Sequence, residues 1–151
     1  MIDINTIPEL KNDFYTHVTW NNLTYPSLEN ALQASKFFSP ERHKAFTTIS
    51  VKQAIAIGSI RKPPVHDWYK QLPAILYDLL MSKFQNENLK KILLSTNDEE
   101  LRYYNKYHDN ILGICTCARC KDNVPQYNLL GKELMIVRSE LKENTLTQDV
   151  P

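Results

Sequence analysis

The segment Tyr25–Phe37 constrains the fold most, because it predicts a helix that carries charges on an otherwise apolar surface. A proline followed by Ser27 can open this helix, since proline fits the first turn and serine caps it. At about 100° per residue, Glu29, Gln33 and Lys36 fall on one face over two turns. The remaining positions are small or apolar, so we expect the helix to pack in the interior. Buried polar groups must then be paired, neutralised or turned toward a ligand, because a lone buried charge is costly. A solvated stripe of charges is the alternative.

Length and composition set the class of protein. The chain has 151 residues, of which 42% are apolar and 23% charged, and these values predict a soluble globular protein with one domain. A formal charge of +1 gives no basis for broad attraction to DNA or to an anionic membrane, although a local basic groove remains compatible with it. The three glycines are scattered, which excludes the common glycine-rich phosphate loops.

The sequence of the N-terminus and the spacing of the cysteines predict where in the cell the protein is found. The N-terminus lacks the basic and apolar regions of a signal peptide, and no apolar run is long enough to suggest a membrane span. The three cysteines are crowded into residues 115–120, which fits reduced thiols better than a disulfide framework. We therefore expect a cytoplasmic protein with no membrane partner.

The predicted elements are mostly helical. Aromatic and β-branched residues around an asparagine pair predict a β-hairpin over 14–25. Hydrophobic spacing and capping residues predict seven helices. The first covers 26–38, the second starts at Ser39-Pro40, and the third runs from the capping box of Ser50 and Gln53 to Gly58. The others cover 73–84, 89–95, 96 or 97 to 107, and 128 or 131 to 142. Residues 59–67 and 108–127 are expected to be irregular. The sequence thus predicts a mainly α, compact single-domain helical bundle with a small N-terminal hairpin, spanning 1–142 and followed by a polar tail, 143–151.

Further polar residues interrupt this scaffold, and each also has a purely structural explanation. Trp68 can stack on a flat ring, but a single tryptophan is more often part of a core. Asp109 lies in a polar trio that is also a common way to end a helix. Asn128 precedes the last predicted helix, where an asparagine commonly serves as a cap.

The cysteines suggest a second kind of site. Cys115, Cys117 and Cys120 with His108 or His17 would supply the tetrahedral ligand set of a structural zinc ion. Against zinc, the usual second pair of ligands at a distance is absent, and a chain of this size can fold without metal. On balance the sequence predicts no metal and no cofactor.

Taken together, the polar clusters resemble the NADAR (YbiA-like) family of N-glycosidases over residues 25–141. The resemblance is carried by several blocks in order: Tyr25-Pro26-Ser27-x-Glu29-x-Ala31-x-Gln33-Ala34-x-Lys36, Asp67-Trp68, Lys83-Phe84 with Leu89, Leu93-Leu94-x-Thr96, Asp109 with Gly113, and Asn128-x-Leu130-Gly131-x-x-Leu134-Met135-x-x-Arg138. It implies a compact, largely helical fold and removal of a base or amine from ribose.

The resemblance implies two classes of substrate. Some relatives remove ADP-ribose from guanine in nucleic acid, and others hydrolyse a phosphoribosylamino-pyrimidine intermediate of riboflavin synthesis. We expect ADP-ribosylated guanine, or a related ADP-ribosyl compound; the alternatives are the ribosyl-phosphate small molecule and a module that binds ADP-ribose without cleaving it. Departures from the family pattern, such as Leu112 in place of a tryptophan and Ser59 in place of an arginine, bear on substrate identity more than on reaction class.

The resemblance and the chemistry of an N-ribosyl bond together suggest residue roles. Glu29 and Asp109 are the expected acid and base. Lys36 is expected to act either as a nucleophile that forms a Schiff base or as the ion-pair partner of Glu29. The expected substrate contacts are made by Gln33, Asn128, Trp68 and Arg61, the last of them to a phosphate.

Overall fold

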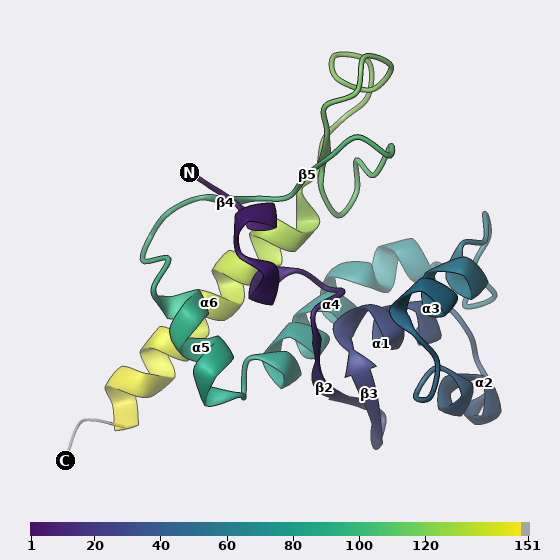
Figure 1. Cartoon of the computed structure of the whole chain (residues 1–151), viewed down its shortest axis with the longest axis horizontal. Coiled ribbons are helices and arrows are strands. Elements are labelled where there is room, and N and C mark those ends of the chain that lie inside the picture. The colour runs from purple at the N-terminus through teal and green to yellow at the C-terminus, as the bar shows by residue number, and fades with distance from the viewer. Residues whose placement is uncertain (149–151) are drawn as a thin grey trace. The chain divides into compact units, whose positions relative to one another are not determined.

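The computed structural model describes residues 1–148 and forms two compact units, which Figure 1 colours along the chain. One unit is residues 12–85, and the other joins residues 1–11 to residues 86–148. Helices make up 47% of the chain, in agreement with the mainly helical expectation. That both units belong to one domain over 1–142 stays a prediction.

The unit of residues 12–85 begins with the predicted hairpin. Strands β2 (Tyr15–Trp20) and β3 (Leu23–Ser27) pair antiparallel, with Val18 opposite Tyr25. Asn21 and Asn22 between them have φ angles of 48° and 63°. Tight hairpin turns need this left-handed conformation at both central residues, and asparagine adopts it readily.

Helix α1 (Leu28–Ala34) starts as predicted but ends four residues before the predicted end at 38. The Ser27 hydroxyl accepts a hydrogen bond from the Asn30 N–H and caps its first turn. Beyond the helix, the carbonyl of Lys36 accepts the Val65 N–H, which lies far along the sequence. The N–H groups of Lys36 and Phe37 bond to the carbonyls of Gln33 and Ala34, three residues before them, so α1 closes in a tighter turn and the prediction of a longer helix was wrong.

The next two helices begin at the capping residues predicted from the sequence, whereas the third begins earlier than predicted. Ser39 caps α2 (Pro40–Ala45), and the capping box of Ser50 opens α3 (Val51–Gly58). Helix α4 (Trp68–Lys83) begins five residues before the predicted Pro73, which lies inside it. Asp67, with a φ of 54°, turns the chain into this helix, and the buried Trp68 anchors its first turn.

The other unit combines short parallel strand pairs with helices. Its elements are β1 (Ile2–Asp3) paired with β4 (Leu101–Arg102), β5 (Tyr104–Asn105) paired with β6 (Ile114–Cys115), the 3₁₀ helices η1 (Ile4–Thr6) and η2 (Pro8–Leu10), α5 (Glu87–Leu94) and α6 (Leu129–Gln148). Helix α6 continues six residues beyond the predicted end at 142, and residues 149–151 of the predicted tail lie outside the described residues. Within the described part of the chain, no helix is both long and apolar enough to cross a membrane.

The helix predicted from 96 or 97 through Tyr107 is wrong. The Thr96 hydroxyl donates to the Leu93 carbonyl, so it closes α5 instead of capping a new helix. Asn97 has a φ of 56°, which no helical residue adopts. The backbone beyond it pairs with β1 and β6, and these long-range bonds outweigh the local capping signals.

Arg138 of α6 holds the turn that follows α5. Its side chain is 7% exposed, and Nη1 donates to the Thr96 hydroxyl and to the Glu99 carbonyl, both at 2.9 Å. Burial lowers the pKa of Arg138, and the nearby carboxylates of Asp98 and Glu99 oppose that shift.

Replacing Arg138 by alanine is therefore expected to lower the free energy of unfolding by about 2–3 kcal/mol, since charge-assisted bonds to buried acceptors are lost. Urea denaturation measures the change. Arg102→Ala is the matched control, because Arg102 bonds the exposed Glu100 carboxylate and the Tyr104 hydroxyl in the same unit, and we expect it to cost less than about 1 kcal/mol. Equal losses in the two variants would show that the Arg138 contacts contribute little.

Candidate functional site

Glu29 and Gln33 form the first part of the candidate site, one turn apart on α1. The Gln33 Nε2 donates to the Glu29 Oε1 at 2.7 Å. Gln33 is 8% exposed and Glu29 is half-buried, so the two are not part of a solvated stripe. The Gln33 Oε1 is buried and has no hydrogen-bond partner among the described residues. An unpaired buried acceptor is costly, and such atoms are found where a ligand or water supplies the partner.

Gly58 lies directly against this glutamine. A Cβ atom at Gly58 would lie 1.9 Å from the Gln33 Oε1 and 2.7 Å from its Cδ, so the buried Gln33 side chain would have to move for any other residue to fit. The end of α3 therefore packs closely on Gln33 through this glycine. From sequence, Gly58 was interpreted only as the end of a helix, and its role in the site was missed.

Lys36 joins three segments of the same unit. Its Nζ donates to the Gly58 carbonyl at 2.9 Å, and its own carbonyl accepts the Val65 N–H at 3.0 Å. The loop between these two contacts, residues 59–64, thus starts and ends at Lys36. Arg61 is exposed in that loop. Arg61 therefore lies on a short loop that is bonded at both ends to Lys36.

The Trp68 ring lies against the Lys36 amine. The Lys36 Nζ lies 5.0 Å from the centroid of the Trp68 ring, a cation–π distance. Trp68 is 4% exposed, and its indole Nε1 donates to the Ser35 hydroxyl at 2.9 Å. Ser35, which the sequence did not single out, therefore positions the ring. The sequence signal that could have indicated this role is the position of Ser35, a small polar residue, directly before Lys36.

Asp109 belongs to the other unit, so its predicted pairing with Glu29 stays a prediction. Its Oδ1 accepts the N–H groups of Ile111 and Leu112, at 3.1 and 2.9 Å. The buried Asn105 fixes its backbone, because the Asn105 side chain bonds both the N–H and the carbonyl of Asp109. The carboxylate is thus held in one orientation by the chain around it.

Asn128 has a structural role in the same unit. Its Oδ1 accepts the Tyr103 N–H, and its Nδ2 donates to the Leu101 carbonyl, both at 3.0 Å. The buried amide thereby ties the start of α6 to β4 and to the residue that links β4 to β5. A contact from Asn128 to a sugar or base stays a prediction.

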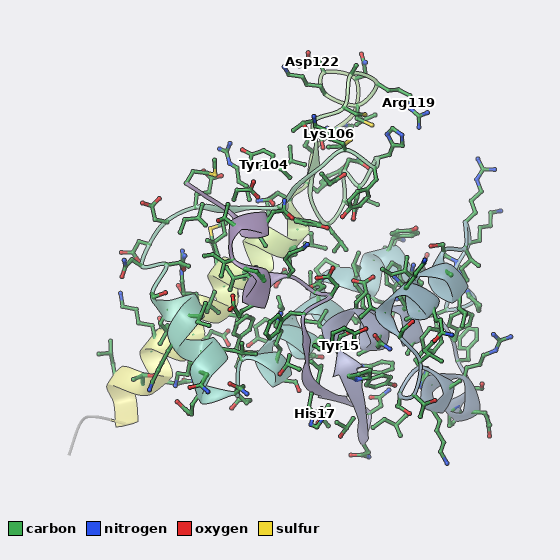
Figure 2. All side chains as sticks on the ribbon, in the orientation of Figure 1. Tyr15, His17, Tyr104, Lys106, Arg119 and Asp122 are labelled. Carbon is green, nitrogen blue, oxygen red and sulfur yellow. The ribbon has the colours of Figure 1, made fainter. Side chains whose placement is uncertain are left out.

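A group of possible metal ligands lies in this unit as well. One ligand atom from each of His108, Cys115, Cys117 and Cys120 lies within 4.8 Å of all the others. Burial opposes ionisation of Cys117, but hydrogen bonds from the Cys115 thiol and from backbone N–H groups lower the pKa of its thiol to about 6. His17, the alternative fourth ligand, is exposed on β2 in the other unit and does not belong to this group (Figure 2).

Comparison with known proteins identifies the family. The model of the NADAR domain matches residues 6–142, and so spans both units. The chain belongs to the NADAR family. It is similar to the NMR structure of the Escherichia coli protein YbiA, with 25% sequence identity and a TM-score of 0.76 over 91% of this chain and 80% of that one. No curated protein matches the chain.

NADAR membership confirms the resemblance inferred from the sequence blocks, and the similarity to YbiA gives the chain a YbiA-like fold. The NADAR family is associated with N-glycosidase-type activity in general. The residues Glu29, Gln33, Lys36 and Trp68 form one set of contacts within residues 12–85 of this NADAR chain.

Proposed function

We propose that this NADAR protein is an N-glycosidase that removes ADP-ribose from the amino group of guanine in nucleic acid. The observation that carries the proposal is the arrangement around α1. A buried amide fixes the Glu29 carboxylate, and Lys36 lies where Gly58, the basic loop and Trp68 meet. An acid, an amine and a cationic loop in one small region suit a reaction at a phosphate-bearing ribose.

The bond to be broken explains the need for carboxylates. An amine on C1 of ribose leaves poorly unless it is protonated or the sugar ring opens. One carboxyl group can donate a proton to the leaving nitrogen, while an ionised one stabilises positive charge at C1 or activates water, as in glycoside hydrolysis. In the proposal Glu29 and Asp109 divide these two tasks.

Lys36 supplies the nucleophile in this proposal. The C1–O4 bond opens to give an imine between C1 and the guanine nitrogen, and the neutral Lys36 amine adds to C1. A proton moves to the guanine nitrogen, guanine leaves, and C1 stays bound to Lys36 as a Schiff base. Water then adds to C1, which frees the lysine and releases ADP-ribose. The sum is hydrolysis of one C–N bond, with no oxidant or reductant.

The loop of residues 59–64 supports a phosphate-bearing substrate. Arg61 and Lys62 are exposed, and both ends of their loop are bonded to Lys36. A cation held near C1 of the ribose fits the diphosphate of ADP-ribose. Trp68 is too buried to stack on a base, so we assign it to the wall of the site.

Two substrates and one ligand test the proposal: a single-stranded oligonucleotide with ADP-ribosylated guanine and the phosphoribosylamino-pyrimidine as substrates, and free ADP-ribose as the ligand. We expect mass spectrometry to detect ADP-ribose released from the oligonucleotide, and Glu29→Ala to abolish the release. Glu41→Ala is the matched control, since Glu41 is an exposed carboxylate on α2 of the same unit, and it should retain wild-type activity.

Two other results would replace the proposal. Release from the pyrimidine compound alone would assign the riboflavin-type activity. Tight binding of ADP-ribose, measured by calorimetry, without turnover of either substrate would assign a binding module.

A further inference from the structure

Residues 106–127, between β5 and α6, form a long segment with almost no apolar interior. The buried residues in this stretch are Gly113, Cys115 and Cys120. A segment of this length needs some source of stability to compensate for its lost conformational entropy. Here the buried side chains are two cysteines, which are small and bury little apolar area.

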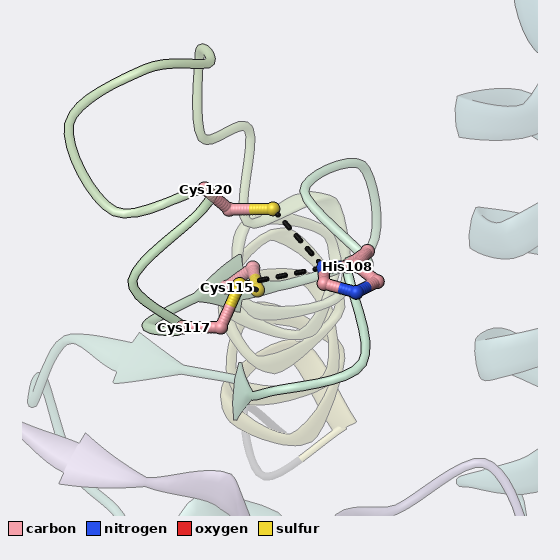
Figure 3. A group of neighbouring side chains, drawn as sticks. All are labelled: His108, Cys115, Cys117 and Cys120. Atoms are coloured by element: carbon pink, nitrogen blue, oxygen red, sulfur yellow. Dashed lines mark hydrogen bonds between the residues drawn. The ribbon is translucent and has the colours of Figure 1, made fainter.

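Four side chains of this segment meet around one point, shown in Figure 3. The His108 Nδ1 lies 3.3 Å from the sulfur atoms of both Cys117 and Cys120, and the Cys115 and Cys117 sulfur atoms are 3.3 Å apart. In a tetrahedral zinc site, bonds of about 2.3 Å to sulfur and about 2.0 Å to nitrogen place neighbouring ligand atoms roughly 3.5–3.8 Å apart. The four side chains therefore already approach the corners of such a tetrahedron.

We propose that His108, Cys115, Cys117 and Cys120 bind one Zn²⁺ ion as a structural Cys₃His site. Four protein ligands leave no open position for water or substrate, which is the mark of a structural rather than a catalytic zinc ion. Soft thiolate ligands also select zinc over magnesium or calcium. The sequence alone favours no metal, because the usual second pair of ligands is absent, whereas the structure brings His108 to the three cysteines.

The backbone positions the ligands before any metal arrives. Cys115 lies in β6, whose pairing with β5 fixes it beside Asn105. A tight turn follows, in which the Cys117 carbonyl accepts the N–H groups of Cys120 and Lys121, at 3.1 and 2.9 Å. This turn holds the sulfur atoms of Cys117 and Cys120 beside the His108 ring.

A glutamine connects the two buried cysteines from outside the cluster. The Gln126 Oε1 accepts the Cys115 N–H at 2.8 Å, and its Nε2 donates to the carbonyls of Cys115 and Cys120, at 3.1 and 3.3 Å. Support of this kind around the ligands is typical of metal sites.

The charges around the cluster suit the proposed ion. Zinc with three thiolates and a neutral imidazole carries a net charge of −1, and Lys106, Arg119 and Lys121 are exposed close to the ligands in sequence. Figure 2 shows Lys106 and Arg119 extending from this loop. Because Asp109 directly follows His108, bound zinc would also fix the segment that carries this carboxylate.

Elemental analysis tests the site on the full chain, produced without a histidine tag and kept reduced. We expect about one zinc per chain, and three thiols that react with a disulfide reagent only after a chelator removes the metal. Replacement of zinc by Co²⁺ should give the strong visible absorption of tetrahedral cobalt together with sulfur-to-cobalt charge-transfer bands.

Variants define the ligand set. His108→Ala, Cys117→Ser and Cys120→Ser should each lower the zinc content at least about tenfold. His17→Ala should keep the wild-type content and is the matched control. Loss of zinc in His17→Ala with retention in His108→Ala would overturn the ligand assignment.

The wild-type protein decides the proposal even where a cysteine variant fails to fold. Reduced protein that holds no zinc after incubation with an equimolar amount, and whose thiols all react freely, would overturn it. Weak octahedral cobalt absorption would overturn it equally. None of these measurements depends on enzymatic activity, so they stand apart from the proposed glycosidase function.

Discussion

Replacing Lys36 by arginine is expected to lower kcat for removal of ADP-ribose from guanine by about 10³-fold or more. A guanidinium keeps the positive charge and can still contact the Gly58 carbonyl and the Trp68 face. It cannot form a Schiff base, because it stays protonated and is a poor nucleophile. Single-turnover assays measure the loss of kcat. Borohydride added during turnover should trap an ADP-ribosyl adduct on Lys36 of the wild type and none in the variant.

The control separates the nucleophile from the ion pair. Glu29→Gln removes the carboxylate that Gln33 orients, and it should lower kcat about 10²- to 10⁴-fold while leaving Lys36 in place. If Lys36→Arg retains activity within about tenfold and no adduct is trapped, Lys36 acts only through its charge. Loss of activity in Glu29→Gln would then still support hydrolysis of an N-ribosyl bond without a covalent step.

Local signals predicted the starts of helices better than their ends. Ser39 and Ser50 cap α2 and α3 as expected, because a cap depends only on the next three residues. Just past the end of α1, the Lys36 carbonyl bonds to the Val65 N–H, a contact between distant residues that no local pattern contains. The same limit explains the error over residues 96–107, where the capping pattern was present but the strands β1 and β6 supply stronger pairing. Pairing between distant segments is not encoded in a local pattern.

The candidate site divides in the same way. The contact between Glu29 and Gln33 followed from their spacing of four residues on a helix. The bond from Lys36 to Gly58 spans twenty-two residues, and no sequence pattern announces it. The three cysteines were found from their spacing, whereas the choice of His108 over His17 needed the turn that follows β5. The contact predicted from Asn128 to a sugar or base stays a prediction, while its amide bonds the main chain of Leu101 and Tyr103.

The packing of Gly58 on Gln33 gives the second large effect. In an unstrained helix, glycine to alanine stabilises a protein by about 0.4–1 kcal/mol, and none of the glycines has a positive φ that an alanine would strain. At Gly58 the new Cβ would meet the Gln33 Oε1 and Cδ. We therefore expect Gly58→Ala to lower the free energy of unfolding by about 1–3 kcal/mol, the cost of overpacking. Displacement of Gln33 should also lower kcat/KM, because Gln33 orients Glu29.

A double-mutant cycle assigns that loss to the contact itself. Gln33→Ala removes the two atoms that the new Cβ meets most closely and leaves the Gln33 Cβ position, 3.0 Å away. In the Gln33→Ala background, Gly58→Ala should therefore cost much less, with a coupling energy of about 1–2 kcal/mol in urea denaturation. Ser59→Ala, one residue further along and exposed, should change stability by less than about 0.5 kcal/mol in either background. Additive effects of Gln33→Ala and Gly58→Ala would mean that the two residues do not touch in solution. The close approach of α3 to α1, on which the position of Lys36 against the Gly58 carbonyl depends, would then not exist in solution.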